Sequence, residues 1–144
     1  MRKSAFTLLE IIIVVVIISI LSIFVISKAQ TSIDSSIKTK IKSDIALIRN
    51  SITKVKTKKI LLKEGSSILL DDANINEKNS KLFNVILAFP LMSTTKEMQE
   101  IGKWIKISSK DYMIYFDDKN NLEFSFENDS FNCKSLLSLC KEFE

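Results

Sequence analysis

The fold is decided by residues 6–27, FTLLEIIIVVVIISILSIFVIS. The stretch holds 22 residues, of which 17 are apolar and only Glu10 is charged. As an α-helix it would be about 33 Å long, which matches a bilayer hydrocarbon core of about 30 Å. We therefore predict one transmembrane helix over residues 6–27.

Two plainer explanations of this segment stay open. A cleaved secretory signal would have an apolar core of only about 7 to 15 residues and a small-residue cleavage site, which is hard to place among residues 22–26. An ordinary signal anchor leaves Glu10 unexplained, because a carboxylate near the bilayer centre costs about 3 kcal/mol and usually marks a functional site. Glu10 could also reach the headgroups, since it lies about 6 Å along the helix from Phe6.

The composition of the 144-residue chain argues against most enzyme classes. It has no His, two Gly, one Pro and two Cys. The chain therefore lacks His-dependent triads, His metal sites and Gly-rich phosphate loops. We expect no catalytic residue and no resident cofactor.

A short basic leader, Met1-Arg2-Lys3-Ser4-Ala5, stands directly before Phe6-Thr7-Leu8-Leu9-Glu10. Together they resemble the N-terminus of the type IV pilin and pseudopilin superfamily. The resemblance implies that a prepilin peptidase cuts between Ala5 and Phe6 and methylates the new amino group of Phe6. It also implies a bacterial inner-membrane protein with a cytoplasmic N-terminus and a periplasmic head.

The resemblance also gives Glu10 a role in assembly. After cleavage, the Phe6 ammonium and the Glu10 carboxylate are each costly in an apolar setting but can neutralise one another. The family pairs these groups between neighbouring subunits. The implied partners are prepilin peptidase, other pilin or pseudopilin subunits bound through the N-terminal helix, and an inner-membrane assembly platform.

Three features fit the resemblance less well. Ala5 stands where the family usually has Gly before the cut. No Gly or Pro occurs before Gly65, although major subunits often carry such a helix breaker. Basic residues flank both ends of the apolar segment, so the positive-inside rule does not set the orientation. Cleavage is still expected, but a role as major subunit is weakened.

An amphipathic helix continues the apolar one over residues 28–63. Its apolar side chains recur at helical spacing, so they form one stripe that must pack on something. Glu64-Gly65 is the predicted stop, which gives a single helix of about 58 residues and about 87 Å. The stripe consists of Ile33, Ile37, Ile41, Ile45, Ile48, Ile52 and Val55.

The basic side chains of this helix lie off the stripe and have two explanations. They could form an electrostatic track for DNA phosphates. We favour a solvated helix face, because no aromatic residue is interleaved to stack bases and the net charge is only +4. The residues are Lys38, Lys40, Lys42, Arg49, Lys54, Lys56, Lys58 and Lys59.

Residues 64–144 are expected to form a small head. Polar clusters at residues 71–74 and 77–80 predict loops. The apolar cluster at residues 82–89 predicts a short buried helix or strand, and Thr94-Thr95-Lys96-Glu97 fits a capping box before a helical turn.

The last third of the chain predicts strands at residues 104–107, 112–116 and 122–126, with a hairpin loop at residues 117–121. The expected fold class is α+β. It is a pilin-like lollipop in which a long N-terminal helix carries a small antiparallel sheet.

The hairpin loop raises the question of calcium. Asp117, Asp118, Asn120 and Asn121 supply oxygen atoms, and major pseudopilins of the resembled family hold calcium in this region. The EF-hand pattern fails, because Lys119 stands where an oxygen ligand is needed. Asp117 and Asp118 are therefore weak calcium candidates, and turn chemistry suffices to explain them.

Cys133 and Cys140 fit neither a CxxC redox motif nor a zinc site. In a continuous helix they would lie about 10.5 Å apart, beyond the roughly 7 Å limit for a bridge. We expect a disulfide if the head is in an oxidising compartment, and two reduced thiols in a small apolar helix if it is in the cytosol. The resemblance favours the disulfide, since pilins often carry a C-terminal disulfide loop.

The predicted segments are the leader (1–5), the transmembrane and assembly helix (6–27), its amphipathic continuation (28–63) and the head (64–144). They imply a structural subunit of a periplasmic pseudopilus or pilus-like filament that serves type II secretion or DNA uptake in natural transformation. The alternatives are a surface type IV pilus subunit and a single-pass anchored extracytoplasmic binding protein that does not polymerise.

Overall fold

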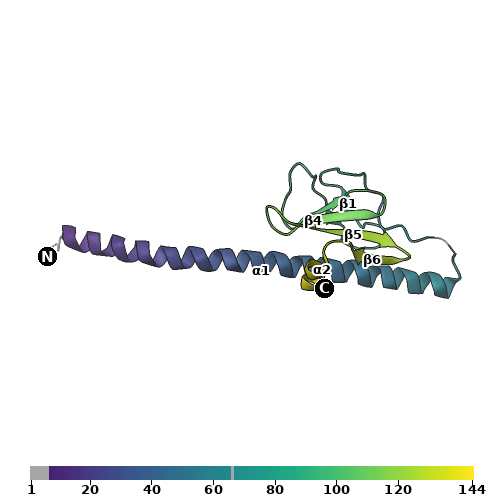
Figure 1. The fold of residues 1–144 in the computed structure, drawn as a ribbon, viewed down its shortest axis with the longest axis horizontal. Coiled ribbons are helices and arrows are strands. Elements are labelled where there is room, and N and C mark those ends of the chain that lie inside the picture. Colours follow the sequence, from purple (N-terminus) through teal and green to yellow (C-terminus); the bar gives the residue numbers. More distant parts are fainter. Residues whose placement is uncertain (1–6, 66) are drawn as a thin grey trace, which may run out of the picture. The chain divides into compact units, whose positions relative to one another are not determined.

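A computed structural model describes residues 7–65 and 67–144, with side chains for residues 7–23, 35–65 and 67–144. Its two compact units are Met1–Ser36 and Ile37–Glu144. A long helix precedes a small antiparallel sheet, so the predicted α+β class is confirmed (Figure 1). The elements are α1 (Leu8–Leu62), β1 (Lys81–Leu82), β2 (Leu91–Met92), β3 (Trp104–Lys106), β4 (Asp111–Tyr115), β5 (Asn121–Glu127), β6 (Ser130–Cys133) and α2 (Leu137–Phe143).

The end of α1 is a Schellman motif, in which two N–H groups beyond the helix bond to carbonyls of its last turn. The Glu64 N–H donates to the Lys59 carbonyl at 3.0 Å, and the Lys63 N–H donates to the Ile60 carbonyl at 3.2 Å. Lys63 has the left-handed conformation that this motif needs, with φ 55°. The predicted helix end at residue 63, before Glu64-Gly65, is confirmed to within one residue, but the left-handed residue of the cap is Lys63 and not Gly65.

We expect Lys63→Gly to stabilise the protein, because glycine adopts this conformation without the cost of about 1 kcal/mol that a side chain carries there. In urea titrations of the full chain in detergent, the free energy of unfolding should rise by up to about 1 kcal/mol. Lys58→Gly is the matched control, since Lys58 is exposed within α1 and the same change there should cost about 1 kcal/mol. A less stable Lys63→Gly protein would contradict the capping geometry.

The four-stranded sheet has the order β3-β4-β5-β6, and each neighbouring pair is antiparallel. The three strands predicted from the sequence are β3, β4 and β5, each within one residue of its predicted ends. Sequence reasoning missed β6. Asn128 and Asp129, with φ values of 51° and 57°, form the two-residue type I′ turn that joins β5 to β6. The sequence signal for this hairpin was the Asn-Asp pair, because both residue types tolerate positive φ.

The apolar stripe of α1 packs into the core of the head. Ile37 and Val55 are partly buried and pack against this hydrophobic core. The side chain of Ile33 lies outside the described residues. The stripe is therefore confirmed from Ile37 to Val55. Its most buried members, each at most 3% exposed, are Ile41, Ile45, Ile48 and Ile52.

The segment between α1 and β3 is fixed by one buried carboxylate. Asp71 is 2% exposed, and its Oδ1 accepts hydrogen bonds from Lys106 Nζ at 2.6 Å and the Ala73 N–H at 3.2 Å. Its Oδ2 accepts from the Tyr112 hydroxyl at 2.8 Å and the Phe83 N–H at 3.1 Å. Burial, and then the charge of Asp71, raises the pKa of Tyr112, so the phenol stays a neutral donor. These donors offset the cost of burying a carboxylate.

The apolar cluster at residues 82–89 is neither a full helix nor a full strand. Leu82 ends β1, and the chain turns at Phe83, whose φ is 59°. The ring of Phe83 lies 4.6 Å from that of Tyr112, and its amide is held by Asp71. The hydrogen bond to Asp71 therefore stabilises a turn at Phe83, where the hydrophobic run predicts a helix or a strand.

The capping box at residues 94–97 also forms no helix. The Met98 and Gln99 amides both donate to the Thr95 carbonyl at 3.2 Å, which makes a single turn. The Thr94 hydroxyl bonds to the Glu100 carboxylate at 3.2 Å instead of capping the turn. The predicted brief helical turn is therefore confirmed as a single turn, although the Thr94 hydroxyl has another partner.

Replacing Asp71 by Asn should strongly destabilise the head, because Lys106 would keep a buried ammonium without a carboxylate. Removing one partner of a buried ion pair costs about 3–5 kcal/mol. The measurement is the urea midpoint of the full chain, and Asp72→Asn is the control because Asp72 is the exposed neighbour. Equal effects of the two substitutions would contradict the burial of the Asp71 charge.

Candidate processing and assembly site

Helix α1 begins with the Thr-x-x-Glu pattern of a capping box, in which Thr7 accepts hydrogen bonds from the first turn. The Glu10 N–H donates to the Thr7 hydroxyl at 3.3 Å and to the Thr7 carbonyl at 3.0 Å. Glu10 therefore lies in the first turn, where the helix dipole favours a negative charge. The residue is exposed, so its carboxylate is open to a partner from another molecule.

Residues 8–23 present apolar side chains on every face of α1. Their large aliphatic side chains are 47–77% exposed. The two serines in this segment bond within the helix. Ser19 Oγ donates to the Val15 carbonyl at 2.7 Å, and Ser22 Oγ donates to the Ile18 carbonyl at 2.8 Å. A helix that is apolar all round needs cover from lipid or from other helices.

Within the described residues, no helix is both long and apolar enough to cross a membrane. The predicted span of residues 6–27 includes Phe6 and the side chains of residues 24–27, which lie outside that description. The leader (1–5) and the cleavage pair Ala5 and Phe6 also lie outside it. The processing site and the span therefore stay predictions.

A disulfide joins Cys133 at the end of β6 to Cys140 in α2, with 5.9 Å between the Cα atoms. The bridge and a helix coexist because the helix begins only at Leu137 and Cys133 lies in a strand. Cys140 and Phe143 are the buried residues of α2. The bridge therefore fastens α2 where Phe143 enters the core.

Ion pairs join α1 to the acidic C-terminal end of the chain. Lys38 Nζ lies 2.6 Å from Glu142 Oε1, and Arg49 Nη2 lies 2.6 Å from Glu144 Oε1. These side chains are 34–45% exposed, so each pair adds at most about 1 kcal/mol. A track for DNA phosphates would need these cations free. The contacts favour the plainer explanation of a solvated, ion-paired face.

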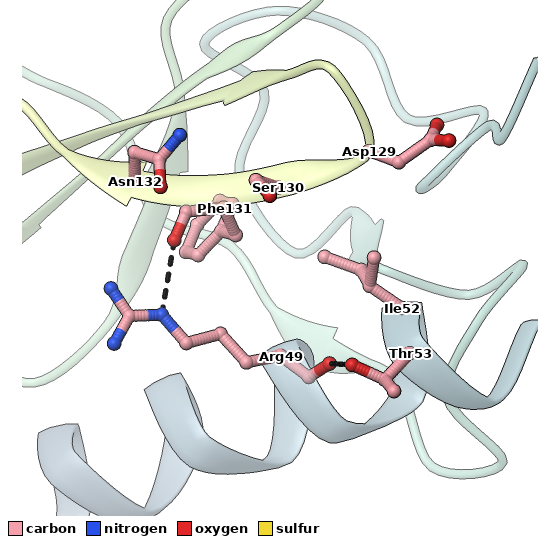
Figure 2. A pocket seen from close by; sticks show the side chains of 7 residues that line it. All are labelled: Arg49, Ile52, Thr53, Asp129, Ser130, Phe131 and Asn132. Atoms are coloured by element: carbon pink, nitrogen blue, oxygen red, sulfur yellow. Dashed lines mark hydrogen bonds between the residues drawn. The ribbon is translucent and has the colours of Figure 1, made fainter. Parts of the chain in front are cut away.

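A pocket of about 230 Å³ opens between α1 and β6 (Figure 2). Arg49 Nε donates across it to the Phe131 carbonyl at 3.0 Å. Phe131 belongs to an edge strand, so Arg49 occupies an acceptor that would otherwise be open to strand pairing. The residues around the pocket thus connect α1 to the edge of the sheet. It is lined by Arg49, Ile52, Thr53, Asp129, Ser130, Phe131 and Asn132.

Asp117 closes the hairpin between β4 and β5. Its Oδ1 accepts from the N–H groups of Lys119 at 2.8 Å and Asn120 at 2.6 Å, and its Oδ2 accepts from Asn120 Nδ2 at 2.8 Å. These bonds, chiefly that from the Asn120 side chain, lower the pKa of Asp117. No group of three or more His, Cys, Asp or Glu in the described part of the chain could hold a metal. Calcium at Asp117 and Asp118 stays a prediction.

Sequence reasoning missed the role of Asp71, and it named Arg49 only as one of the basic side chains off the stripe and not as a contact to β6. Asp71 stands beside Asp72 in a polar cluster, and nothing in the sequence separates the buried carboxylate from the exposed one. The available signal was Lys106, which falls inside a predicted strand and is 7% exposed. A lysine on a buried strand needs an anionic partner.

Residues 1–26 match the family model described as the prokaryotic N-terminal methylation motif. This motif is the N-terminal signal of type IV pilins and pseudopilins, so the resemblance is confirmed over this segment. It supports a type IV pilin-like subunit, processed by prepilin peptidase and assembled with other pilin subunits; its family is structural rather than enzymatic. The chain matches no curated protein and no solved structure.

Removing the disulfide should loosen the C-terminal end. By the loop-entropy relation, a bridge across a separation of seven residues is worth about 2 kcal/mol. The double substitution Cys133→Ser and Cys140→Ser should lower the free energy of unfolding by that amount, measured by urea titration. The reduced wild-type chain serves as the control and should match the double variant. An unchanged urea midpoint would show that α2 is held without the bridge.

Proposed function

We propose that this chain is a structural, non-enzymatic subunit of a periplasmic pseudopilus or pilus-like filament. The observation that carries the proposal is the methylation motif at residues 1–26, placed at the start of a helix whose residues 8–23 present apolar side chains on every face. In this proposal prepilin peptidase cuts between Ala5 and Phe6 and methylates Phe6. The mature chain then begins one residue before the capping threonine, Thr7.

The assembly step follows from electrostatics in an apolar setting. The new Phe6 ammonium of one subunit and the Glu10 carboxylate of its neighbour neutralise one another, which removes the cost of burying either charge alone. The exposed position of Glu10 in the first turn of α1 supports this pairing. The pairing sets the axial register while the apolar faces of neighbouring helices pack together.

The proposed location before assembly is the inner membrane, with residues 6–27 as the span, the N-terminus in the cytoplasm and the head in the periplasm. The disulfide between Cys133 and Cys140 supports an oxidising compartment for the head. The proposed partners are prepilin peptidase, other pilin or pseudopilin subunits and an assembly platform. The proposed system is type II secretion or DNA uptake, with a surface type IV pilus as the near alternative.

One observation favours a second candidate, an anchored binding protein that does not polymerise. The helix dipole already stabilises a negative charge at Glu10 in the first turn of α1, so this carboxylate has a local role without a partner. The two candidates differ in whether Glu10 is needed for assembly or only for the start of α1.

The first experiment is the intact mass of the protein extracted from native membranes, with and without reduction. We expect a chain that begins at methylated Phe6 and gains two protons on reduction. An uncut chain that begins at Met1 and has free thiols would remove the filament proposal.

Substituting Glu10 separates the two candidates. We expect Glu10→Gln to abolish filament assembly while leaving cleavage intact, because the amide cannot neutralise the Phe6 ammonium. Assembly is measured by shearing filaments from cells and by electron microscopy. Glu64→Gln is the matched control, because Glu64 is exposed just after α1. Normal filaments from the Glu10→Gln protein would favour the anchored binding protein.

A further inference from the structure

The last turns of α1, with Lys63 just after them, carry exposed charged and aliphatic side chains. The lysines of this group are exposed and have no ion pair within the described residues. The aliphatic side chains are 68%, 76% and 56% exposed, in chain order. Such a surface fits a partner that is both acidic and apolar. We name it the tip surface, and its residues are Lys54, Lys58, Ile60, Leu61, Leu62 and Lys63.

The opposite combination occurs near the C-terminus. Leu136 and Leu137 are 73% and 71% exposed. Asp118 and Glu123 are exposed carboxylates without an ion pair in the part of the chain that the structure describes. The Glu123 N–H donates to Ser135 Oγ at 2.9 Å, which places Glu123 beside the residue that precedes Leu136. We name Asp118, Glu123, Leu136 and Leu137 the C-terminal surface.

Asp118 is tied to α2 by the packing of the hairpin that carries it. Phe116, at the base of that hairpin, lies with its ring 5.1 Å from the ring of Phe143 in α2. Lys134, the lysine nearest in sequence to Leu136, forms an ion pair in which its Nζ lies 3.3 Å from Glu127 Oε1. The carboxylates of the C-terminal surface are thus left for a partner outside the head.

The two surfaces do not serve each other within one copy. Ion pairs to Lys38 and Arg49 hold α2 against α1. Leu61 lies 12 residues beyond Arg49, which is about 18 Å further along the helix. Each surface therefore meets its complement only in another molecule.

We propose that the tip surface of one copy binds the C-terminal surface of a second copy. The contact joins two different surfaces, so it can repeat from copy to copy and extend an open assembly. It rests on the proposed filament function, for which it supplies a contact between heads that is independent of Glu10. An anionic membrane would also suit the tip surface, but it leaves the C-terminal surface without a partner.

The test places a photo-cross-linking amino acid at Leu61 of the full chain, expressed in its native membrane. We expect a cross-linked dimer in which position 61 of one copy is joined to residues 118–144 of the other, identified by mass spectrometry of the digest. Lys58→Glu with Lys63→Glu should reduce the dimer at least about tenfold, because like charges then face each other. Adding Asp118→Lys and Glu123→Lys to the same chain should restore it.

Lys81→Glu with Lys96→Glu is the matched control, since both lysines are exposed and belong to neither surface. It should leave the dimer unchanged. A cross-link from position 61 only to lipid or to another protein, or none at all, overturns the proposal, as does failure of the charge exchange to restore the dimer. The N-terminal mass of the same sample separates the two failures. A mature methylated chain without the dimer keeps the filament function, whereas an uncut chain removes both.

Discussion

The buried ion pair between Asp71 and Lys106 is the interaction on which the head depends. Asp71 comes from the loop after α1, Lys106 from β3, and the Tyr112 hydroxyl from β4. A carboxylate this deeply buried is tolerable only where its donors meet, so one arrangement of the loop is strongly favoured over others. The long segment between helix and sheet holds its shape through this centre rather than through regular secondary structure.

The same helix serves two different surroundings. In the head, one face of α1 is covered by the core, and the isoleucines from Ile41 to Ile52 are almost fully buried. Over residues 8–23 every face is apolar and exposed in the single chain. This contrast follows from the hydrophobic pattern, one-sided in the later segment and continuous in the earlier one. It makes the N-terminal half incomplete without lipid or other subunits, as the methylation motif implies.

Charge is distributed in a related way. The basic residues of α1 that face the C-terminal end are paired with its carboxylates, as Lys38 is with Glu142 and Arg49 with Glu144. Arg49 also closes the edge of β6 through the Phe131 carbonyl. These contacts and the disulfide hold the acidic C-terminal end against α1. Beyond them, Lys54, Lys58 and Lys63 are exposed and have no ion pair within the described residues, and these are the lysines of the proposed tip surface.

The elements with local signals could be predicted from the amino-acid sequence alone. The apolar run, the motif around Phe6 and Glu10, the isoleucine stripe and strands β3 to β5 are all set by composition and period, because helices and strands impose fixed spacings on buried residues. The other features depend on tertiary contacts. It selected Asp71 over Asp72, placed Lys63 in the left-handed turn, added β6 and put Cys140 but not Cys133 in a helix. These features depend on contacts between residues far apart in the sequence or on the backbone conformation of single residues. Such contacts and conformations leave no periodic pattern in the sequence.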